Sequence, residues 1–367
     1  MNRHSNAITI GGFDHIEVIR LGGGLPVVIQ TMWKDRLSFT DIEGIPGKET
    51  VSRINRLKDM GCGLLRFAVP DIKTAEIMGN LASQVSLPLV ADIHFDYKIA
   101  LRCLDFPIAK IRVNPGNIKK QHIEQILSKA ASKGRPLRIG VNGGSLPMDL
   151  RRSIKTGDLD PLEALVVAAE QALALFQAAG FLQVILSIKT SSIADTIKVN
   201  RMVADRTDVP LHIGVTEAGP LIAGVVRNTF ALHTLLSAGI GDTIRVSLSD
   251  TMENEVIAGR EILRAVAENK GEKHEGVAVI SCPRCGRNSF DTHAFIQKWQ
   301  PLLYQMRKNV TIAIMGCAVN GPEEARHADL GITGVGTKVL LFRHGKIIKT
   351  IDTVEADAAF KDALEKL

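Results

Sequence analysis

Residues 87–117 read LPLVADIHFDYKIALRCLDFPIAKIRVNPGN, and this stretch contains the unit from which most of the chain is built. An apolar run, Leu87–Ile93, is followed by a segment with helical periodicity, Tyr97–Leu104, and then by a second apolar run, Ala109–Val113. Near-continuous apolar runs of this length are typical of strands in a parallel sheet that helices cover on both faces. The stretch therefore predicts a strand–helix–strand unit.

The same unit recurs along most of the chain. Apolar runs, each followed by a helical pattern, occur at 27–31, 64–69, 87–93, 109–113, 137–141, 183–188, 211–215 and 243–248. Eight strand–helix units in about 240 residues match a closed (β/α)₈ barrel better than an open doubly wound sheet, which usually has fewer strands. The sequence thus predicts an α/β fold with a TIM barrel over residues 1–267.

In such a barrel the chemistry is expected at the carboxyl ends of the strands and in the loops that follow them. Polar side chains lie at these positions in every predicted strand, and the candidate site residues among them are Arg66, Asp92, His94, Arg112, Arg138, Asn142, Lys189, Glu217, Arg245 and Ser247. A single arginine here could simply pair with a neighbouring carboxylate. Arginines and a lysine repeated at one end of successive strands instead indicate a positive basin that binds phosphate.

Three of the candidates could transfer protons, either near neutral pH or where the protein shifts their pKa. Asp92, His94 and Glu217 are the titratable groups that we expect beside a bound substrate. Each could equally be a structural hydrogen-bonding group, so the sequence leaves their roles open.

Composition narrows the class of ligand. The 367 residues carry a formal net charge of +6, but aromatic residues make up only 4%, with no basic run interleaved with stacking side chains. Nucleic acid is therefore disfavoured, and a small anionic substrate is favoured. The first ten residues contain no apolar run, and the most hydrophobic segment, Pro161–Gly180, carries Glu163 and Glu170. We expect a cytoplasmic protein without a membrane span.

Three of the five cysteines lie in two motifs near the C-terminus, SCPRCG at 281–286 and MGCAVNGPEE at 315–324. Cys282, Cys285 and Cys317 offer three soft ligands for one metal centre, one fewer than a closed zinc or iron–sulfur site uses. Cys62 and Cys103 lie in apolar surroundings and are expected to be core residues.

The fourth ligand has two interpretations. A carboxylate, Glu324 or Glu323, could fill the position weakly at a catalytic iron–sulfur centre. Alternatively, His293 or His327 could complete a structural zinc site. Spacing alone does not separate iron from zinc.

A polar segment, residues 268–276, predicts a linker between the barrel and a smaller α+β domain at 277–367. There we expect strands at 277–281, 310–315, 338–343 and 346–351, helices at 291–307 and 354–367, and a glycine-rich segment after the third cysteine. Both cysteine motifs follow predicted strands, so their loops can meet at one edge of the small domain.

Taken together, the longer motifs resemble one enzyme family. They are ADIHFD, RVNPGNI, RIGVNGGSL, HIGVTEAG, GIGDTIRVSL, CPRC and GCAVNGP, in this order along nearly the whole chain. Sequences of this kind are typical of the 4-hydroxy-3-methylbut-2-enyl diphosphate synthases in their two-domain bacterial form. The resemblance implies a TIM barrel joined to a domain similar to those of sulfite and nitrite reductases.

The resemblance also implies a [4Fe-4S] cluster held by three cysteines and one glutamate. Matched to this sequence, the ligands would be Cys282, Cys285, Cys317 and Glu324. The family usually has glycine where this chain has Glu323, a departure that places a second carboxylate beside the expected ligand.

The reaction implied is the two-electron reductive opening of 2-C-methyl-D-erythritol 2,4-cyclodiphosphate, with loss of a hydroxyl as water, in isoprenoid precursor synthesis. Glu217 would supply the proton, and Asp92 and His94 would orient the groups that bind the diphosphate. Those groups are Arg66, Arg112, Arg138, Asn142, Lys189, Arg245 and Ser247. The family arrangement further implies a head-to-tail homodimer, with flavodoxin or ferredoxin as electron donor.

Two other functions fit parts of the pattern. One is an aldolase that acts on a sugar phosphate, with Lys189 as a Schiff-base nucleophile and the cysteines as a zinc site. The other is a nucleic-acid-binding or iron-sensing protein, which the low aromatic content disfavours.

Overall fold

The computed structural model describes residues 3–42, 44–272, 276–317 and 321–367. The chain divides into two compact units, Met1–Glu272 and Lys273–Leu367, and each unit is described here by itself. Of the predicted linker, residues 273–275 lie outside the described part, and residues 268 and 269 belong to the last helix of the first unit.

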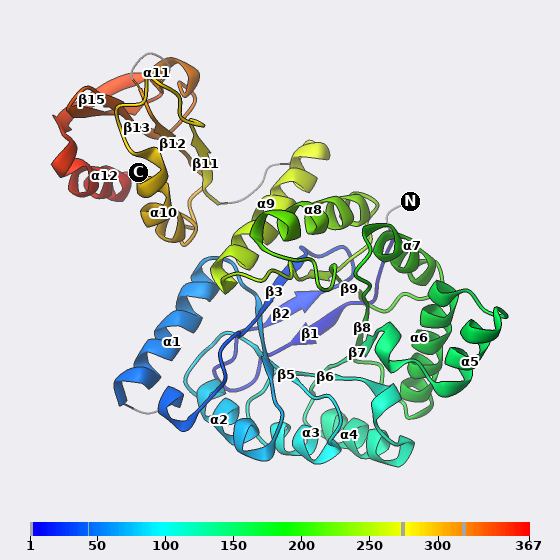
Figure 1. The fold of residues 1–367 in the computed structure, drawn as a ribbon. Helices are drawn as coiled ribbons and strands as arrows, with labels where there is room; N and C mark the ends of the chain where they lie inside the picture. Colours follow the sequence, from blue (N-terminus) through cyan, green and yellow to red (C-terminus); the bar gives the residue numbers. More distant parts are fainter. Residues whose placement is uncertain (1–2, 43, 273–275, 318–320) are drawn as a thin grey trace. The chain divides into compact units, whose positions relative to one another are not determined.

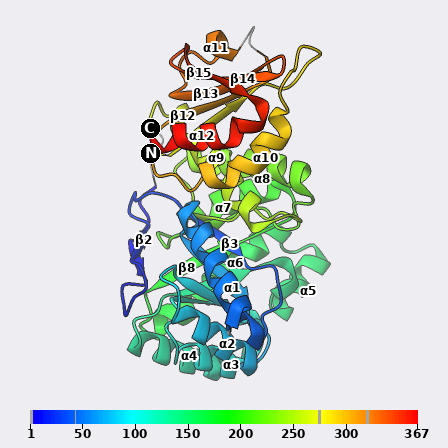
Figure 2. The same cartoon turned by 90° about the vertical axis from the view of Figure 1, so that its left-hand side faces the viewer.

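The first unit is a parallel eight-stranded barrel (Figures 1 and 2). Its strands are β3 (Val28–Met32), β4 (Leu64–Ala68), β5 (Leu89–Asp92), β6 (Lys110–Val113), β7 (Leu137–Val141), β8 (Val184–Ile188), β9 (His212–Ile213) and β10 (Thr243–Ile244). The sheet runs in the order β8-β7-β6-β5-β4-β3-β10-β9, and a parallel bridge between Leu186 and Leu211 joins its two edges. The prediction of a TIM barrel is confirmed.

Helices form the outer ring around these strands, as Figure 1 shows. They are α1 (Gly44–Asp59), α2 (Ile72–Ala82), α3 (Tyr97–Cys103), α4 (Lys120–Ser132), α5 (Met148–Thr156), α6 (Pro161–Ala178), α7 (Ile193–Ala204), α8 (Leu221–Ser237) and α9 (Met252–Asn269), with short 3₁₀ turns η1 (Phe39–Ile42), η2 (Pro115–Asn117) and η3 (Gly143–Ser145). Side-chain caps fix several starts: Asp71, Ser192 and Thr251 accept hydrogen bonds from backbone N–H groups three residues on. By length and composition α6 could cross a membrane, but 44% of it is buried inside the protein and it belongs to the outer ring of helices.

An antiparallel hairpin, β1 (Ile8–Ile10) with β2 (Ile19–Leu21), precedes the barrel and was not predicted. Its buried side chains Ile8, Ile10 and Leu21 form one apolar cluster with Leu64 and Val90, which lie at or near the amino ends of their strands. Figure 2 shows β2 at one end of the barrel. The hairpin therefore closes the amino end with apolar side chains.

The second unit is a five-stranded mixed sheet in the order β11-β12-β13-β14-β15. Its elements are β11 (Ala278–Ser281), α10 (Thr292–Leu303), β12 (Thr311–Met315), α11 (Gly321–Glu324), β13 (Leu330–Val335), β14 (Lys338–Arg343), β15 (Lys346–Asp352), the turn η4 (Thr353–Glu355) and α12 (Ala356–Glu365). Strands β11, β12 and β13 are parallel, whereas β14 and β15 continue the sheet antiparallel. The expected α+β arrangement is present.

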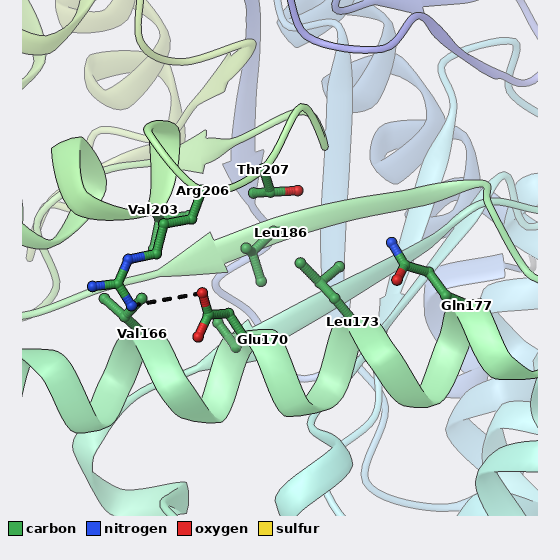
Figure 3. Close-up of a pocket in the computed structure, with 9 residues that line it drawn as sticks. Val166, Glu170, Leu173, Gln177, Leu186, Val203, Arg206 and Thr207 are labelled. Atoms are coloured by element: carbon green, nitrogen blue, oxygen red, sulfur yellow. Dashed lines mark ion pairs between the residues drawn. The ribbon is translucent and has the colours of Figure 1, made fainter.

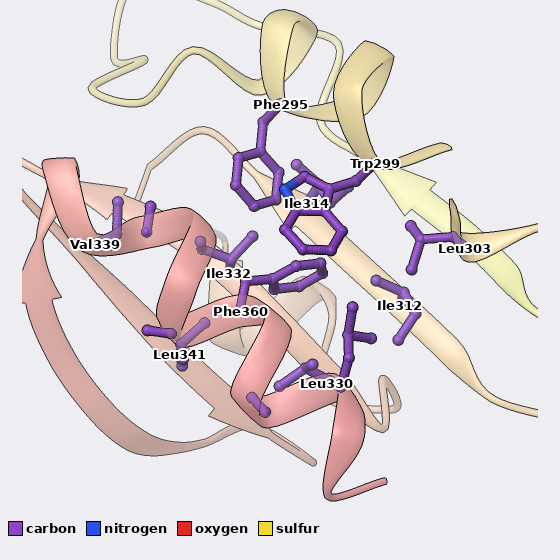
Figure 4. Close-up of a cluster of buried hydrophobic side chains, with 14 of the residues drawn as sticks. Phe295, Trp299, Leu303, Ile312, Ile314, Leu330, Ile332, Val339, Leu341 and Phe360 are labelled. Atoms are coloured by element: carbon purple, nitrogen blue, oxygen red, sulfur yellow. The ribbon is translucent and has the colours of Figure 1, made fainter. Parts of the chain in front are cut away.

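The central strand β13 lies in the glycine-rich segment that the sequence had not assigned to a strand. Its glycines are needed because large side chains occupy the space beside them: a Cβ on Gly331 would overlap the ring of Phe342, and one on Gly334 would crowd Phe290. Figure 4 shows the core to which Phe290 belongs, where Phe360 of α12 lies beside Phe295 and Trp299 of α10; Phe342 belongs to a separate cluster with Ala313 and Met315.

This close approach gives a test of the fold. We expect Gly331→Ala to lower the free energy of unfolding of the second unit by about 1–3 kcal/mol, because the new methyl group collides with the ring of Phe342. Chemical denaturation followed by Trp299 fluorescence measures the change.

The double variant Gly331→Ala/Phe342→Leu provides the control, since leucine lacks the ring atoms that the methyl group meets. It should recover part of the loss. The explanation would be contradicted if the double variant lost as much free energy of unfolding as the two single variants lose together.

Candidate functional site

The barrel interior is lined by polar side chains where most TIM barrels have branched apolar ones. Side chains alternate along a strand, so those that share a face with the buried Leu64 and Val90 point inward. The inward polar residues are Gln30, Arg66, Asp92, Lys110, Arg112, Arg138, Ser187, His212, Thr243 and Arg245. A hydrogen bond of 3.2 Å from Lys110 Nζ on β6 to Gln30 Oε1 on β3 crosses this interior.

Asp92 is the first of two carboxylates that organise these cations. Arg112 Nη1 lies 3.0 Å from Asp92 Oδ1, Arg66 Nε 3.5 Å from Oδ2, and His94 Nε2 3.7 Å from Oδ2. Burial acts to raise the pKa of Asp92, but the contact with His94 and the charges of the arginines outweigh it and hold this pKa far below its ordinary value. Asp92 is therefore ionised at neutral pH.

Glu255 of α9 is the second carboxylate, and its side chain is 1% exposed. Arg245 donates to both of its oxygens, at 3.3 and 3.2 Å, and Lys34 lies 2.9 Å from Oε1. Thr31 Oγ1 and the backbone N–H of Leu248 donate further hydrogen bonds to it. Burial favours the neutral acid, but these partners outweigh it and lower the pKa of Glu255. The carboxylate fixes the position of Arg245 at the end of β10.

Arg138 and Lys189 complete the group without a carboxylate of their own. Among the described residues, Arg138 Nε and Nη1 are buried and have no hydrogen-bond partner. Burial and the neighbouring cations lower the pKa of both side chains well below their ordinary values, and burial, with Arg245 and Arg112, lowers that of Arg66 to about 10. Buried donors without acceptors indicate a place for an anion.

Two inward glycines are required by close neighbours. A Cβ on Gly140 would lie 2.6 Å from Arg112 Nε, and one on Gly214 would lie 2.4 Å from the backbone carbonyl oxygen of Arg245. The motif RIGVNGGS thus has glycine at an inward position because the Arg112 side chain fills the space, and HIGVTEAG has it because the backbone of Arg245 passes close by.

The structure brings seven predicted site residues into one electrostatic group, which we call the basin. Its members are Arg66, Asp92, His94, Arg112, Arg138, Lys189 and Arg245, and Lys110 and Glu255 join them. Six of these nine described residues are Arg or Lys and two are carboxylates. A trivalent or divalent anion would balance much of the surplus positive charge.

Three predicted residues lie in loops at the carboxyl end of the barrel. Glu217 is exposed after β9 and has a left-handed backbone, with φ of 53°, a conformation that is uncommon for a residue other than glycine and often marks a functional site. Asn142 is exposed after β7, where its turn is closed by Ser145. Ser247 is half-buried after β10. Their roles in binding and catalysis stay predictions.

Sequence reasoning missed Lys110 and Glu255. Lys110 lies two residues before Arg112 and so shares its inward face, a signal that period-two alternation contains. Glu255 lies on the apolar stripe of α9 beside Met252, Val256 and Gly259, where an acidic residue needs a buried partner.

The predicted metal ligands lie at the edge of the second unit where its parallel strands end. Cys282 directly follows β11, and its backbone N–H donates to the carbonyl of Ile314 on the neighbouring strand β12, 3.2 Å away. Cys317 follows β12 and is buried, Cys282 is half-buried and Cys285 is exposed. All three are free thiols. Adjacent parallel strands therefore bring both cysteine motifs to one edge.

The segment that follows the second cysteine is held against the residue before the third. Asn288 donates its backbone N–H to the carbonyl of Cys285, and Ser289 donates to that of Gly316. Gly316 leaves room for the Asn288 side chain, and Arg284 adopts a left-handed backbone, with φ of 69°, between the two cysteines. The soft thiolate donors and this arrangement fit an iron–sulfur or zinc centre.

The fourth ligand is less defined. Glu323 and Glu324 are both exposed on the short helix α11, and residues 318–320, which connect it to Cys317, lie outside the described part of the chain. Within the described ranges, no group of three or more His, Cys, Asp or Glu side chains is placed to hold a metal ion. The predicted set of ligands stays a prediction.

A separate cavity of about 280 Å³ lies outside the barrel, between α6, β8 and α7 (Figure 3). Leu173 and Leu186 line it, and Arg206 closes it by pairing with Glu170 at 3.6 Å and with Glu163 at 2.7 Å. None of the predicted site residues reaches this cavity, and its ion pairs join surface helices. We regard it as structural.

Comparison with known proteins covers both units. A family model described as the GcpE TIM-barrel domain matches residues 14–260, and another described as the GcpE protein C-terminal domain matches residues 278–366. The proteins named 4-hydroxy-3-methylbut-2-en-1-yl diphosphate synthase (flavodoxin) from Treponema pallidum and Treponema denticola are 45% and 46% identical. The alignments cover 99% and 98% of this chain, and 92% and 98% of those relatives.

The solved structures give a weaker likeness. A dihydropteroate synthase from Stenotrophomonas maltophilia is 14% identical, with a TM-score of 0.46, over 66% of this chain and 93% of that one. This level of likeness carries no argument about function.

The Asp92 network predicts how stability depends on pH. Because the folded state lowers the pKa of Asp92, its contribution to stability is fully present above the ordinary value of about 4 and is lost as pH falls toward the folded pKa. We expect Asp92→Asn to cost about 3–5 kcal/mol at pH 7, because two buried arginines lose their partner, and to weaken the pH dependence below pH 4. Urea unfolding between pH 3 and pH 7 measures both effects.

Asp149→Asn is the matched control, since Asp149 is exposed. It should reproduce the stability of the original protein across this range. Parallel stability curves for Asp92→Asn and the original protein would show that Asp92 does not have the assigned role.

Proposed function

The chain belongs to the GcpE family, and from this membership we propose that it makes 4-hydroxy-3-methylbut-2-en-1-yl diphosphate by a two-electron reduction of 2-C-methyl-D-erythritol 2,4-cyclodiphosphate. The reaction opens the cyclic diphosphate, releases a hydroxyl group as water and leaves a linear allylic diphosphate. Such a product is an isoprenoid precursor, and we expect the reaction to take place in the cytoplasm.

The basin is the observation that carries this proposal. Its cations outnumber its carboxylates, and the unpartnered donors of Arg138 face a closed interior. A cyclic diphosphate offers several oxygens to guanidinium groups that are already oriented by Asp92 and Glu255, so little ordering is left for the binding step. Arg66, Arg112, Lys189 and Arg245 would bind the same diphosphate, with Asn142 and Ser247 at its rim.

The negative charge of the substrate is also needed for the electrostatics of the barrel. Without an anion, burial first and then the repulsion of neighbouring cations lower the pKa of Arg138 and Lys189. Binding of the diphosphate relieves this repulsion. The binding energy can then hold the reacting carbons in a fixed orientation while the leaving groups depart.

Glu217 is proposed to deliver the proton that lets the hydroxyl leave as water. Its left-handed backbone lies in the loop after β9, at the carboxyl end of the barrel, and its carboxyl group is exposed to an incoming ligand. His94 and Asp92 would orient Arg66 and Arg112 rather than take part in proton transfer, because their recorded contacts are with those arginines and with one another.

We propose that Cys282, Cys285, Cys317 and Glu324 hold a [4Fe-4S] cluster. The three free thiols at the ends of neighbouring parallel strands support this assignment, and Glu324 follows from the family pattern. When bound, such a cluster would supply the two electrons one at a time. Flavodoxin, which the relatives' name includes, is the expected electron donor, with ferredoxin as another possibility.

A homodimer would bring the cluster domain of one subunit over the barrel of the other. In support, α8 exposes an apolar ridge at helical spacing, formed by Ile222, Val226 and Phe230, whose exposed fractions are 80%, 62% and 63%. Beside it, Ile193, Ile197 and Met202 of α7 line an apolar hollow of about 560 Å³.

Charges at the edge of the hollow favour a second copy of the chain as the partner. Arg201 and Asp205 carry opposite charges one helical turn apart, so two-fold symmetry can pair each with its opposite on the other subunit. A ridge beside a hollow is self-complementary in the same way. The proposed dimer therefore uses the α7 and α8 face.

The comparisons do not support the aldolase or the nucleic-acid-binding alternative, since both the family models and the named relatives belong to the diphosphate synthases. For an aldolase, Lys189 would be the nucleophile, and covalent trapping of a substrate carbonyl would be its sign.

Metal analysis under anaerobic conditions tests the cluster. We expect about four irons and four sulfides per chain, with a broad absorption band, and reductant-driven turnover of the cyclodiphosphate. Cys317→Ala should lose the cluster and the turnover, because one of three thiolate ligands is removed.

Cys103→Ala is the control, since this thiol is buried in the barrel unit. It should retain iron and sulfide. Stoichiometric zinc without sulfide, reproduced after anaerobic reconstitution, would contradict the proposed function.

Light scattering tests the dimer. We expect Phe230→Glu to give a monomer that retains its iron but loses turnover, because a charge in the ridge cannot be buried against a second copy. Leu182→Glu introduces the same charge at another exposed apolar position and should stay dimeric. A dimeric Phe230→Glu protein would rule out this face as the interface.

A further inference from the structure

Below the arginines, the barrel holds a second buried cationic group that the reaction does not use. Lys110 lies one inward position nearer the amino end than Arg112, and its side chain is completely buried. Beneath it is the apolar cluster formed by the hairpin with Val90 and Ala109. Lys110 thus lies between an apolar floor and the guanidinium groups of the basin.

Its surroundings offer an ammonium group little stabilisation. Among the described residues, the hydrogen bond that Lys110 Nζ makes is the one to Gln30 Oε1. Burial and the charges of Arg138 on β7 and Arg66 on β4 lower the pKa of Lys110 well below its ordinary value. On β9, burial and the nearby cations also lower the pKa of His212, which leaves its imidazole neutral.

The carboxylates of the barrel are engaged elsewhere. Asp92 contacts Arg66, Arg112 and His94 at the carboxyl end of β5, and Glu255 contacts Arg245 and Lys34 at the end of β10. The remaining polar atoms near the floor are neutral: Gln30 Nε2 and His212 Nε2 are buried without a hydrogen-bond partner among the described residues, and Thr243 Oγ1 lies 2.7 Å from His212 Nδ1. The charge that could stabilise a protonated Lys110 must come from a ligand.

We propose that Lys110 is a positioning residue that takes up a proton when the diphosphate enters the basin, and thereby adds a positive charge beneath the ligand only in the complex. The proton moves from solvent to the amine Nζ, and no other bond changes. This inference rests on the proposed function, because it needs an anionic ligand above Arg138 and Arg66.

The sign of the pH dependence follows from linkage. In this proposal the pKa of Lys110 is higher in the complex than in the free protein. The affinity for diphosphate therefore decreases as pH rises from the pKa in the free protein to the pKa in the complex. Below that window Lys110 is charged in both states, and above it Lys110 is neutral in both. The proton taken up on binding is greatest inside the window.

Titration calorimetry of the full-length protein with inorganic diphosphate tests this proposal. Measurement at pH 8 in two buffers of different ionisation enthalpy gives the number of protons taken up. We expect Lys110→Met to take up fewer protons than the original protein, by up to about one per barrel, and to bind about tenfold more weakly at pH 7, a difference that shrinks as pH rises.

Two further variants make the result specific. Lys133→Met removes an exposed lysine and should leave proton uptake and affinity unchanged. Lys189→Met removes a cation of the basin and should weaken binding, while the proton uptake that depends on Lys110 persists. Uptake that is intact in Lys110→Met but abolished in Lys189→Met would overturn the assignment to Lys110.

Thermal unfolding separates this role from a purely structural one. Lys110→Met should melt no lower than the original protein, since methionine fills a similar volume without a buried amine. Lower melting with unchanged proton uptake would show that Lys110 only supports the fold. If the original protein fails to bind diphosphate, the basin is not the proposed anion site; if it binds with equal uptake in Lys110→Met, only the present inference fails.

Discussion

Repulsion between like charges inside a closed barrel is the constraint on which the rest of the structure depends. Five cations and the buried amine of Lys110 face the interior; Asp92 bridges cations inside the barrel, and Glu255 of α9 pairs with Arg245 and Lys34 at its carboxyl end. Glycine at Gly140 makes room for the side chain of Arg112. Asp92 and Glu255 therefore stabilise the empty protein and, in doing so, orient the groups that bind an anion. Fold stability and ligand recognition share the same contacts.

Much of this could be predicted from sequence, because parallel strands that are covered by helices have a distinct apolar pattern. The eight strands, and the polar residues at their carboxyl ends, follow directly from that pattern. Lys110 was missed because it lies within a strand, where an apolar residue is expected, and Glu255 because it lies on a helix outside the barrel. The partner of Lys110, which is Gln30, and the partner of Glu255, which is Arg245, cannot be identified without knowing that β6 lies opposite β3 and that α9 lies close to Arg245.

The second unit shows the limit of pattern reading more clearly. Strand β13 contains two glycines and was not predicted, since glycine weakens a strand by itself. Its place in the sheet depends on Phe342, which lies opposite Gly331 on the next strand, and on Phe290, which lies far from Gly334 in sequence. By contrast, the meeting of the two cysteine motifs was foreseeable, because both follow strands that run in parallel. The same rule gathers the basin residues in the barrel.

The hairpin at the amino end of the barrel affects how ligands enter and leave. Ile8, Ile10 and Leu21 cover that end with apolar side chains, so an anion would reach the basin from the carboxyl ends of the strands. Substrate, product and displaced water would then share one route. Turnover is then strictly sequential: a product that stays in place excludes its successor, and the solvent expelled by an arriving anion leaves against the direction of entry.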